Sequence, residues 1–443
     1  MTATSKFLIL GTDIVDSKDR RKSDVYIEDG KISQVEKAGE LSSSNFSGAH
    51  VIDADGLVLS PGIVDIQVHF REPGREEAED IETGSRSAAV GGMVAVQTMA
   101  NTYPRVDSVE TYLDIKERSK KAHCDVYQAA AITKNLESEE LSDMQGLYEA
   151  GARTFTDDGE CVKTARVMRE AIETLSNFDD VILAQHCEDH SLVHDGVMDE
   201  GEISAQLGLP GRHRVAEEII IERDIALMKA FASQKLRYHV LHISTKEGLE
   251  AVRRGQEQGV RVTTEVAPQH TVLTSDLLLS GNTSFKMNPP MRTKADTQAL
   301  REGLADGSIS AIATDHAPHP PEMKEQGLLL APPGMLGVET ALSVGITHLV
   351  KTGVLTLQEL IKVMSINPAR IINADRDGHG LDIVPGNPAN LVLFDENEKW
   401  IIDSQQLHSK SLNSPWEGNE LSGKVLYTFL RGQMTCEKGN PTK

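Results

Sequence analysis

Cysteine is scarce in this chain, and no two cysteines lie close together. The 443 residues contain four of them, without any CxxC pair: Cys124, Cys161, Cys187 and Cys436. A disulfide scaffold needs paired cysteines and an oxidising compartment. The cysteine pattern therefore argues against a disulfide-stabilised secreted protein and favours a reducing cytoplasm.

Long apolar runs and an excess of positive charge are also missing. The N-terminal stretch MTATSKFLILGTDIV has one short apolar run, broken by Gly11 and Asp13. It is too short and too polar for a signal peptide or a membrane span. Lys and Arg number 45 against 67 Asp and Glu, a formal net charge of −22, which repels nucleic acid and anionic membranes. We expect a soluble cytoplasmic protein whose small anionic substrate, if it has one, binds in a locally basic pocket.

A Gly-rich phosphate turn after the first strand of the central region is absent, which disfavours a doubly wound sheet. The central region instead alternates apolar, strand-like segments with amphipathic segments such as 164–175 and 246–258. The strand-like segments are residues 63–70, 93–100, 124–132, 152–159, 181–189, 237–245, 261–270 and 309–319. Eight strands alternating with helices over roughly 250 residues predict an α/β fold, the (β/α)8 TIM barrel.

The two ends of the chain have a different pattern. Segments such as 7–11 and 25–35 near the N-terminus, and 387–395 and 424–432 near the C-terminus, alternate apolar and polar residues as half-buried strands do. We expect both ends to build one small β-sandwich. The predicted organisation is residues 1–57 for the first part of the sandwich, 58–375 for the barrel and 376–443 for the second part.

Polar residues follow the apolar strands of the predicted barrel at the points where these strands end. In PGIVDIQVHFREPG, residues 61–74, four aliphatic residues precede His69 and Arg71. Any single polar residue at such a place is more often a satisfied loop residue. Five strand ends, however, carry a candidate metal ligand: His69, Asp158, His186, His242 and Asp315. Imidazoles with carboxylates suit a divalent ion of the zinc type, which activates water and polarises a carbonyl. Asp315 is the best candidate for the carboxylate that carries the proton.

A second group of polar residues could bind the substrate. Arg71 offers paired hydrogen bonds to a carboxylate, and Asn101 and Asn288 offer both donors and acceptors to an amide edge. Arg292 and His319 also follow strands or lie in long loops. Turn or capping roles remain open for Asn101 and Asn288, which stand before Thr-Tyr-Pro and Pro-Pro.

The motifs DIQVHFREPG, MANTYP, FTDDG, AQHCED, VLHIST, KMNPPMR and ATDHAPH, in this order over residues 55–395, resemble the dihydroorotase branch of the amidohydrolase superfamily. The resemblance implies a metal-dependent barrel with a β-sandwich that reversibly hydrolyses the cyclic amide of dihydroorotate in pyrimidine synthesis. By position it implies metal ligands at His69, Asp158, His186, His242 and Asp315, with Asp315 also the general acid/base. It implies substrate contacts at Arg71, Asn101, Asn288 and His319. An aspartate, Asp158, stands in the bridging place that a carbamylated lysine fills in related enzymes, which counts against a hydantoinase.

Three positions depart from the family pattern. Gln67 replaces the first histidine of the usual HxH pair, Ala100 replaces the proline of MPNT, and Gln269 replaces a histidine after the seventh strand. A glutamine carbonyl is a weak zinc ligand, so we expect one Zn²⁺ ion, with the second position weak or empty.

Two alternatives to a dihydroorotase remain open at this point. One is another cyclic amidase, such as an allantoinase or a hydantoinase. The other is a catalytically impaired, dihydroorotase-like scaffold subunit that binds another pyrimidine-pathway enzyme, such as aspartate transcarbamoylase. We also expect a homo-oligomer.

Overall fold

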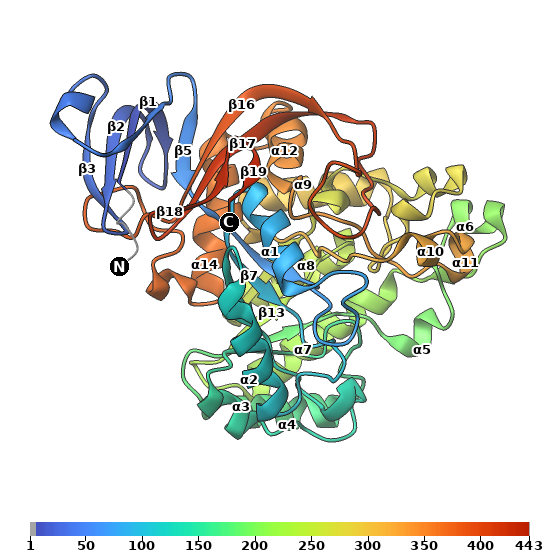
Figure 1. The fold of residues 1–443 in the computed structure, drawn as a ribbon. Coiled ribbons are helices and arrows are strands. Elements are labelled where there is room, and N and C mark those ends of the chain that lie inside the picture. Colours follow the sequence, from blue (N-terminus) through green and yellow to red (C-terminus); the bar gives the residue numbers. More distant parts are fainter. Residues whose placement is uncertain (1–5, 443) are drawn as a thin grey trace.

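The computed structural model describes residues 6–442. It shows a barrel of parallel strands with a large β-sheet from both termini at its side (Figure 1). One three-stranded sheet contains β6 (Ile63–Val68), β7 (Met93–Thr98) and β8 (Asp125–Gln128). One five-stranded sheet contains β9 (Thr154–Thr156), β10 (Ile182–Gln185), β13 (Arg237–Val240), β14 (Val262–Val266) and β15 (Ala311–Ile312). Parallel bridges Ala130–Phe155 and Val68–His316 join the two sheets into a closed ring, which confirms the predicted barrel.

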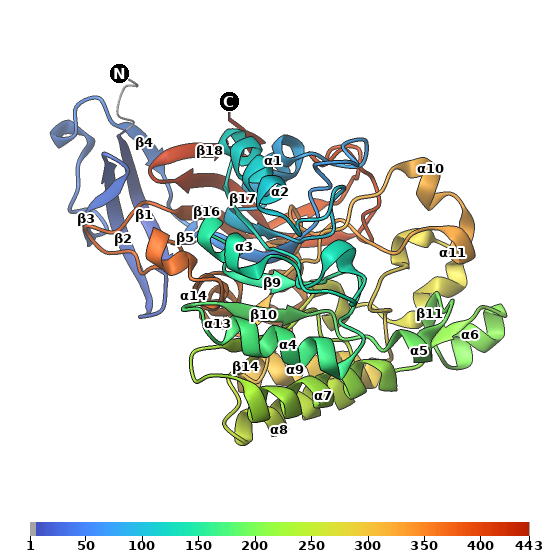
Figure 2. The ribbon, with the colours of Figure 1, turned by 90° about the horizontal axis from the view of Figure 1, so that it is seen from below.

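Amphipathic helices cover the outside of this barrel. In Figure 2, α4, α7 and α8 lie along one side of it, and the contacts of α4 with α7 and of α7 with α8 agree with this view. In α4 the apolar residues recur at helical spacing and are buried, and Thr164 caps the first turn. The longer helices before β15 are α1 (Ile81–Val90), α2 (Val109–Arg118), α3 (Met144–Ala150), α4 (Ala165–Leu175), α7 (Val215–Phe231), α8 (Lys246–Glu257) and α9 (Lys294–Asp306).

Two segments add short elements to the barrel. The excursion after β10 contains α5 (His190–Val193), β11 (Met198–Asp199), α6 (Glu202–Leu207) and β12 (Gly211–Arg212). The chain after β15 forms α10 (Pro321–Lys324), α11 (Gly327–Leu330), α12 (Ala341–Gly345), α13 (Leu357–Ile361) and α14 (Asn367–Ile371).

The terminal strands form one nine-stranded sheet with the order β19-β18-β17-β16-β5-β1-β2-β3, and β4 pairs with β1. Its strands are β1 (Phe7–Val15), β2 (Arg20–Glu28), β3 (Lys31–Lys37), β4 (His50–Asp53), β5 (Val58–Pro61), β16 (Leu391–Ile401), β17 (Glu420–Leu430), β18 (Gln433–Glu437) and β19 (Asn440–Pro441). The rings of Phe7 and Phe429 meet edge to face, with centroids 5.1 Å apart, inside a core shared by both ends. The small β-sandwich expected from both termini is present as a β-domain whose strands form one continuous sheet.

The predicted boundaries at 57/58 and 375/376 stay predictions. β5 lies just beyond the first of them and pairs with β1 and β16 of the terminal sheet, so the barrel strands begin at Ile63. No helix within residues 6–442 has both the length and the apolar character that a membrane crossing requires. All four cysteines are free and buried.

Candidate metal centre and active site

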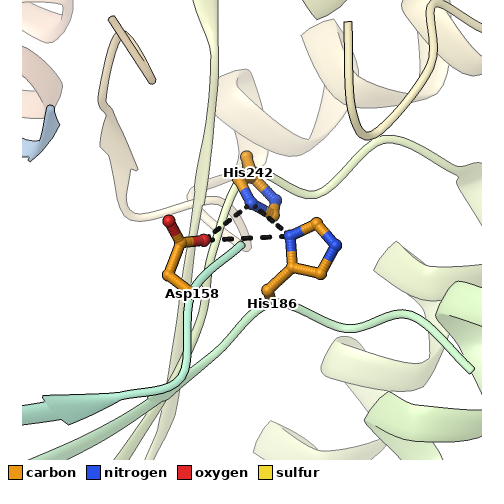
Figure 3. A group of neighbouring side chains, drawn as sticks. All are labelled: Asp158, His186 and His242. Atoms are coloured by element: carbon orange, nitrogen blue, oxygen red, sulfur yellow. Dashed lines mark hydrogen bonds and ion pairs between the residues drawn. The ribbon is translucent and has the colours of Figure 1, made fainter. Parts of the chain in front are cut away.

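Asp158, His186 and His242 form a buried cluster at the carboxyl ends of β9, β10 and β13. Figure 3 shows the two imidazole rings and the carboxylate directed toward one another. His242 Nε2 lies 2.9 Å from His186 Nδ1 and 3.3 Å from Asp158 Oδ1, and His186 Nδ1 lies 3.8 Å from the same oxygen. The potential ligand atoms of the three residues all lie within 4.8 Å of one another.

His69 and Asp315 extend this cluster from the ends of β6 and β15. His69 Nε2 lies 3.0 Å from Asp315 Oδ1 and 3.4 Å from Asp158 Oδ2. The five residues expected at strand ends are thus brought together in one buried group.

The donor set fits a divalent cation. His69 Nδ1 lies 3.0 Å from the acceptor Asn101 Oδ1, so the ring can donate from Nδ1 and offer Nε2 to a cation that lies between it and the carboxylate oxygens of Asp158 and Asp315. Two facing imidazole nitrogens at 2.9 Å likewise need a shared proton or cation, and the buried His242 Nδ1 has no hydrogen-bond partner in the described chain. Imidazole and carboxylate donors are the ligands that zinc-type ions take.

The pKa shifts of Asp158 and His242 describe an ionised carboxylate beside one basic imidazole. Burial alone would raise the pKa of Asp158, but the bond to His242 and the nearby imidazoles hold it well below its usual range. Burial also disfavours the charged form of His242, yet Asp158 and Asp315 raise its pKa to about 9. A buried group with this much negative potential attracts a cation.

The local backbone aims these side chains into the site. Arg71, His242 and Asp315 have φ of 60°, 29° and 49°, a left-handed conformation that is uncommon outside glycine. The buried Asp65 accepts hydrogen bonds from the Thr314 N–H (3.1 Å) and hydroxyl (2.6 Å), which fixes the end of β15 just before Asp315. Strain of this kind persists where the surrounding structure over-determines it, as at active sites.

Gln67 lies in the same buried group, two residues before His69. Its Nε2 donates to Asp158 Oδ1 at 3.1 Å, and its Oε1 has no hydrogen-bond partner in the described chain. A reversed amide would set two oxygens against each other, so the donating orientation is the favourable one. Gln67 therefore contacts the cluster through the carboxylate of Asp158.

The four expected substrate contacts lie around the cluster. Arg71 Nε donates to Pro318 O (3.3 Å), and its Nη2 lies 3.5 Å from His319 Nε2. Burial, with Arg71 and Lys324 nearby, lowers the pKa of His319 to about 2, so its ring is neutral. Asn101 Oδ1 contacts His69 Nδ1. A Cβ on Gly159, the glycine of FTDDG, would lie only 2.7 Å from Asn101 Nδ2, and its φ of +89° also favours glycine.

A network around Asn288 was not expected from the sequence. Asn288 Nδ2 lies 3.3 Å from His186 Nε2, and its Oδ1 accepts from Arg212 Nη1 at 2.7 Å. Arg212 Nη1 also donates to both carboxylate oxygens of Glu188, at 2.7 and 2.8 Å. Glu188 follows the histidine of AQHCED, but Arg212 comes from the excursion after β10, and no sequence pattern brings it to this site.

Arg292 is not brought to the cluster. Its guanidinium is buried in an ion pair with Asp199 at 2.5 Å and also donates to Ser244 Oγ at 3.1 Å. These contacts connect the excursion to the segment after β13, so the role of Arg292 is structural.

The barrel and its nitrogen and oxygen donors are those of the metal-dependent amidohydrolases. The chain matches the family described as Dihydro-orotase-like over residues 56–248. It is 43% identical to the dihydroorotase of Streptomyces coelicolor over 441 residues, covering 99% of this chain and 100% of that protein. The dihydroorotase of Acetivibrio thermocellus is 40% identical, covering 97% and 99%. The chain belongs to the dihydroorotase family.

Solved structures share the fold. The L-hydantoinase of Arthrobacter aurescens superposes with a TM-score of 0.87 at 25% identity, covering 99% of this chain and 97% of that one. The dihydropyrimidinase of Brevibacillus agri gives a TM-score of 0.84 at 20% identity, covering 99% and 96%. These likenesses agree with the barrel and the terminal sheet.

Proposed function

We propose that this enzyme is a dihydroorotase, which interconverts dihydroorotate and N-carbamoyl-aspartate in pyrimidine synthesis. The observation that carries the proposal is the position of Arg71, whose guanidinium lines the same cavity as His69 of the ligand cluster. A guanidinium beside the reacting centre suits a cyclic amide that bears a carboxylate. An uncharged hydantoin ring would leave this charge without a partner.

The ion in this proposal is one Zn²⁺, held by His186, His242 and Asp158, with His69 and Asp315 completing the ligand set. When bound, such an ion supplies Lewis acidity to a ring carbonyl and to a water molecule. Asp158 holds its negative charge against burial through His242, and Gln67 fixes its orientation.

Asp315 is the proton carrier in this proposal. Its buried carboxylate follows β15 and lies 3.0 Å from His69 Nε2, within the ligand cluster. It takes a proton from the attacking water and gives one to the ring nitrogen as the amide C–N bond breaks. Arg71 and His319 hold the substrate carboxylate, while Asn101 and Asn288 hold the amide edge.

The remaining parts of the proposal concern location and assembly. The family resemblance supports a cytoplasmic homo-oligomer and an association with aspartate transcarbamoylase. Light scattering of the purified chain alone measures its oligomeric state. The same measurement on a mixture with aspartate transcarbamoylase tests the association.

The decisive experiment is turnover of the metal-loaded chain in both directions. We expect ring opening of dihydroorotate and ring closure of N-carbamoyl-aspartate, both lost with Asp315→Asn. Gln67 is the feature that favours the alternative, a scaffold subunit with an impaired site. Absence of turnover in either direction, with the metal bound, would reject the enzyme and leave the scaffold.

A further inference from the structure

A cavity of about 150 Å³ connects the candidate site to the surface on the side of β6 and β7. Its inner wall includes His69, Arg71 and Asn101, and its outer wall includes Arg75 and Arg105 together with Tyr103. His69 is 7% exposed whereas Tyr103 is 44% exposed, so the cavity runs from the buried cluster to solvent. A small ligand that follows this path meets the outer arginines first.

Arg75 and Arg105 both stack on the ring of Tyr103. Their guanidinium carbons lie 4.7 and 4.3 Å from the ring centroid, and each Nη2 donates to the tyrosine hydroxyl at 3.2 Å. Arg105 Nη1 also donates to the carbonyl of Asn101 at 2.7 Å. These contacts hold both side chains in place without neutralising them.

Neither outer arginine has a carboxylate partner in the described chain, although acidic residues outnumber basic ones by 67 to 45. Of the two glutamates in the cavity wall, Glu72 pairs with Arg118 at 2.8 Å. Glu160 lies 3.7 Å from His190, beyond hydrogen-bond distance, so one carboxylate charge remains against the three arginines of the wall. The cavity therefore keeps a net positive charge on a strongly acidic molecule.

The outer arginines share this cavity with the inner one, because Arg71, Arg75 and Arg105 all line it. Repulsion between guanidinium groups in one cavity is relieved when an anion enters.

We propose that Arg75, Tyr103 and Arg105 form a cationic entrance that favours the ring-opened dicarboxylate over the ring-closed monocarboxylate. The inference rests on the proposed function. Ring opening consumes water, breaks the amide C–N bond and converts the carbonyl carbon into a second carboxylate, with release of one proton. Arg71 accounts for the carboxylate that both compounds share. Additional fixed positive charge therefore acts more strongly on the compound with two negative charges.

Binding constants test this entrance directly. The ratio of kcat/KM in the two directions equals the overall equilibrium constant, which no variant can change. We therefore compare dissociation constants by calorimetry on metal-loaded Asp315→Asn chains, in which turnover is blocked. Adding Arg75→Gln should weaken N-carbamoyl-aspartate binding about five-fold and dihydroorotate binding less than two-fold. Salt at 0.5 M should remove most of this difference, because it screens exposed charges.

Two further variants serve as controls. Arg75→Lys keeps the charge and should retain most of the preference. Arg169 in α4 does not line the cavity; it stacks on Phe231 at 4.4 Å and pairs with Glu173 at 2.8 Å. Arg169→Gln therefore removes a stacked arginine without unpaired charge and should change neither constant. Equal weakening of both compounds by Arg75→Gln, or no weakening, would overturn the inference. If the unaltered enzyme turns over dihydroorotate, either of these results rejects only the entrance and leaves the proposed function intact. Absence of turnover in the unaltered chain would reject the proposed function itself.

Discussion

We expect Gln67 to limit how many ions the candidate site can hold tightly. Its amide nitrogen is used to hold Asp158 at 3.1 Å, and only a neutral carbonyl oxygen remains as a possible ligand. Neutral amide oxygens suit hard cations such as Ca²⁺, whereas zinc-type ions prefer imidazole. We therefore expect Gln67 to act on a bound ion through the carboxylate of Asp158, as residues behind metal ligands commonly do.

This arrangement predicts a metal stoichiometry. The unaltered chain should contain about one tightly bound ion, and Gln67→His should raise the number toward two. Gln67→Met, which removes the bond to Asp158, should keep about one ion but weaken its affinity by about ten-fold. Elemental analysis after dialysis measures the stoichiometry, and competition with a chelator measures the affinity. Two tightly held ions in the unaltered chain would contradict this account.

Arg71 and Asp315 should have separable roles. Arg71→Lys keeps a positive charge but loses the planar pair of donors, so kcat/KM should fall by the equivalent of about 1–3 kcal/mol. Asp315→Asn should abolish the chemical step while dihydroorotate still binds. Steady-state kinetics and calorimetric binding separate the two effects. Loss of binding with normal chemistry in the Asp315 variant would mean that the roles are reversed.

The meeting of the five strand-end residues could be predicted, because parallel barrel strands bring their carboxyl ends to one face. The contacts of Arg212 could not. This residue lies 24 positions after Glu188, within an excursion of short elements whose path depends on tertiary packing. Arg292 pairs with Asp199, which belongs to the same excursion. The sequence alone therefore could not show that Arg292 lies outside the candidate site.

At the scale of elements, apolar runs predicted all the barrel strands but overstated their lengths. The segment 309–319 contributes only Ala311–Ile312 to the ladder. The residues that follow leave the regular strand geometry, since Thr314 bonds to Asp65 and Asp315 takes a left-handed φ of 49°. Local alternation also indicated terminal strands, yet it contains no information on the β5–β16 pairing that joins them into one sheet.

The segment after β15 contains a buried lysine that makes the stability of the protein depend on pH. Lys324, at the end of α10, donates to Pro332 O at 2.9 Å and to Gly334 O at 3.1 Å. Burial and the nearby Lys286 lower its pKa from 10.5 to about 7. Between these two values the unfolded chain binds one proton more than the folded chain, so the stability contributed at Lys324 rises with pH.

This linkage gives a prediction for Lys324→Met. Relative to this variant, the unaltered chain should gain on the order of 2 kcal/mol in free energy of unfolding as the pH rises from 7 to 9. Urea unfolding at several pH values measures the difference, with Lys351→Met at an exposed position as the control. A constant difference over this range would show that Lys324 is not buried with a depressed pKa.

At the scale of the whole molecule, the candidate metal ligands come from both parts of the barrel. His69 belongs to the three-stranded sheet, whereas Asp158, His186 and His242 follow strands of the five-stranded sheet. Hydrogen-bonded ladders do not continue between the two sheets, which meet through isolated bridges. An ion held by residues from both sheets therefore adds a connection where the backbone pairing is sparse.

Removal of the ion should consequently lower the stability of the entire chain. An ion present at 1,000 times its dissociation constant stabilises the folded state by about 4 kcal/mol. For a chain of 443 residues this corresponds to a fall of about 4 °C in Tm on chelation, and Zn²⁺ should restore it. In His186→Ala and His242→Ala the Tm should already be low and should not respond to chelator, because each variant lacks one ligand. If chelator lowers the Tm of these variants by the same amount, the stabilising ion is bound elsewhere. If chelator does not lower the Tm of the unaltered chain, the cluster does not hold an ion tightly.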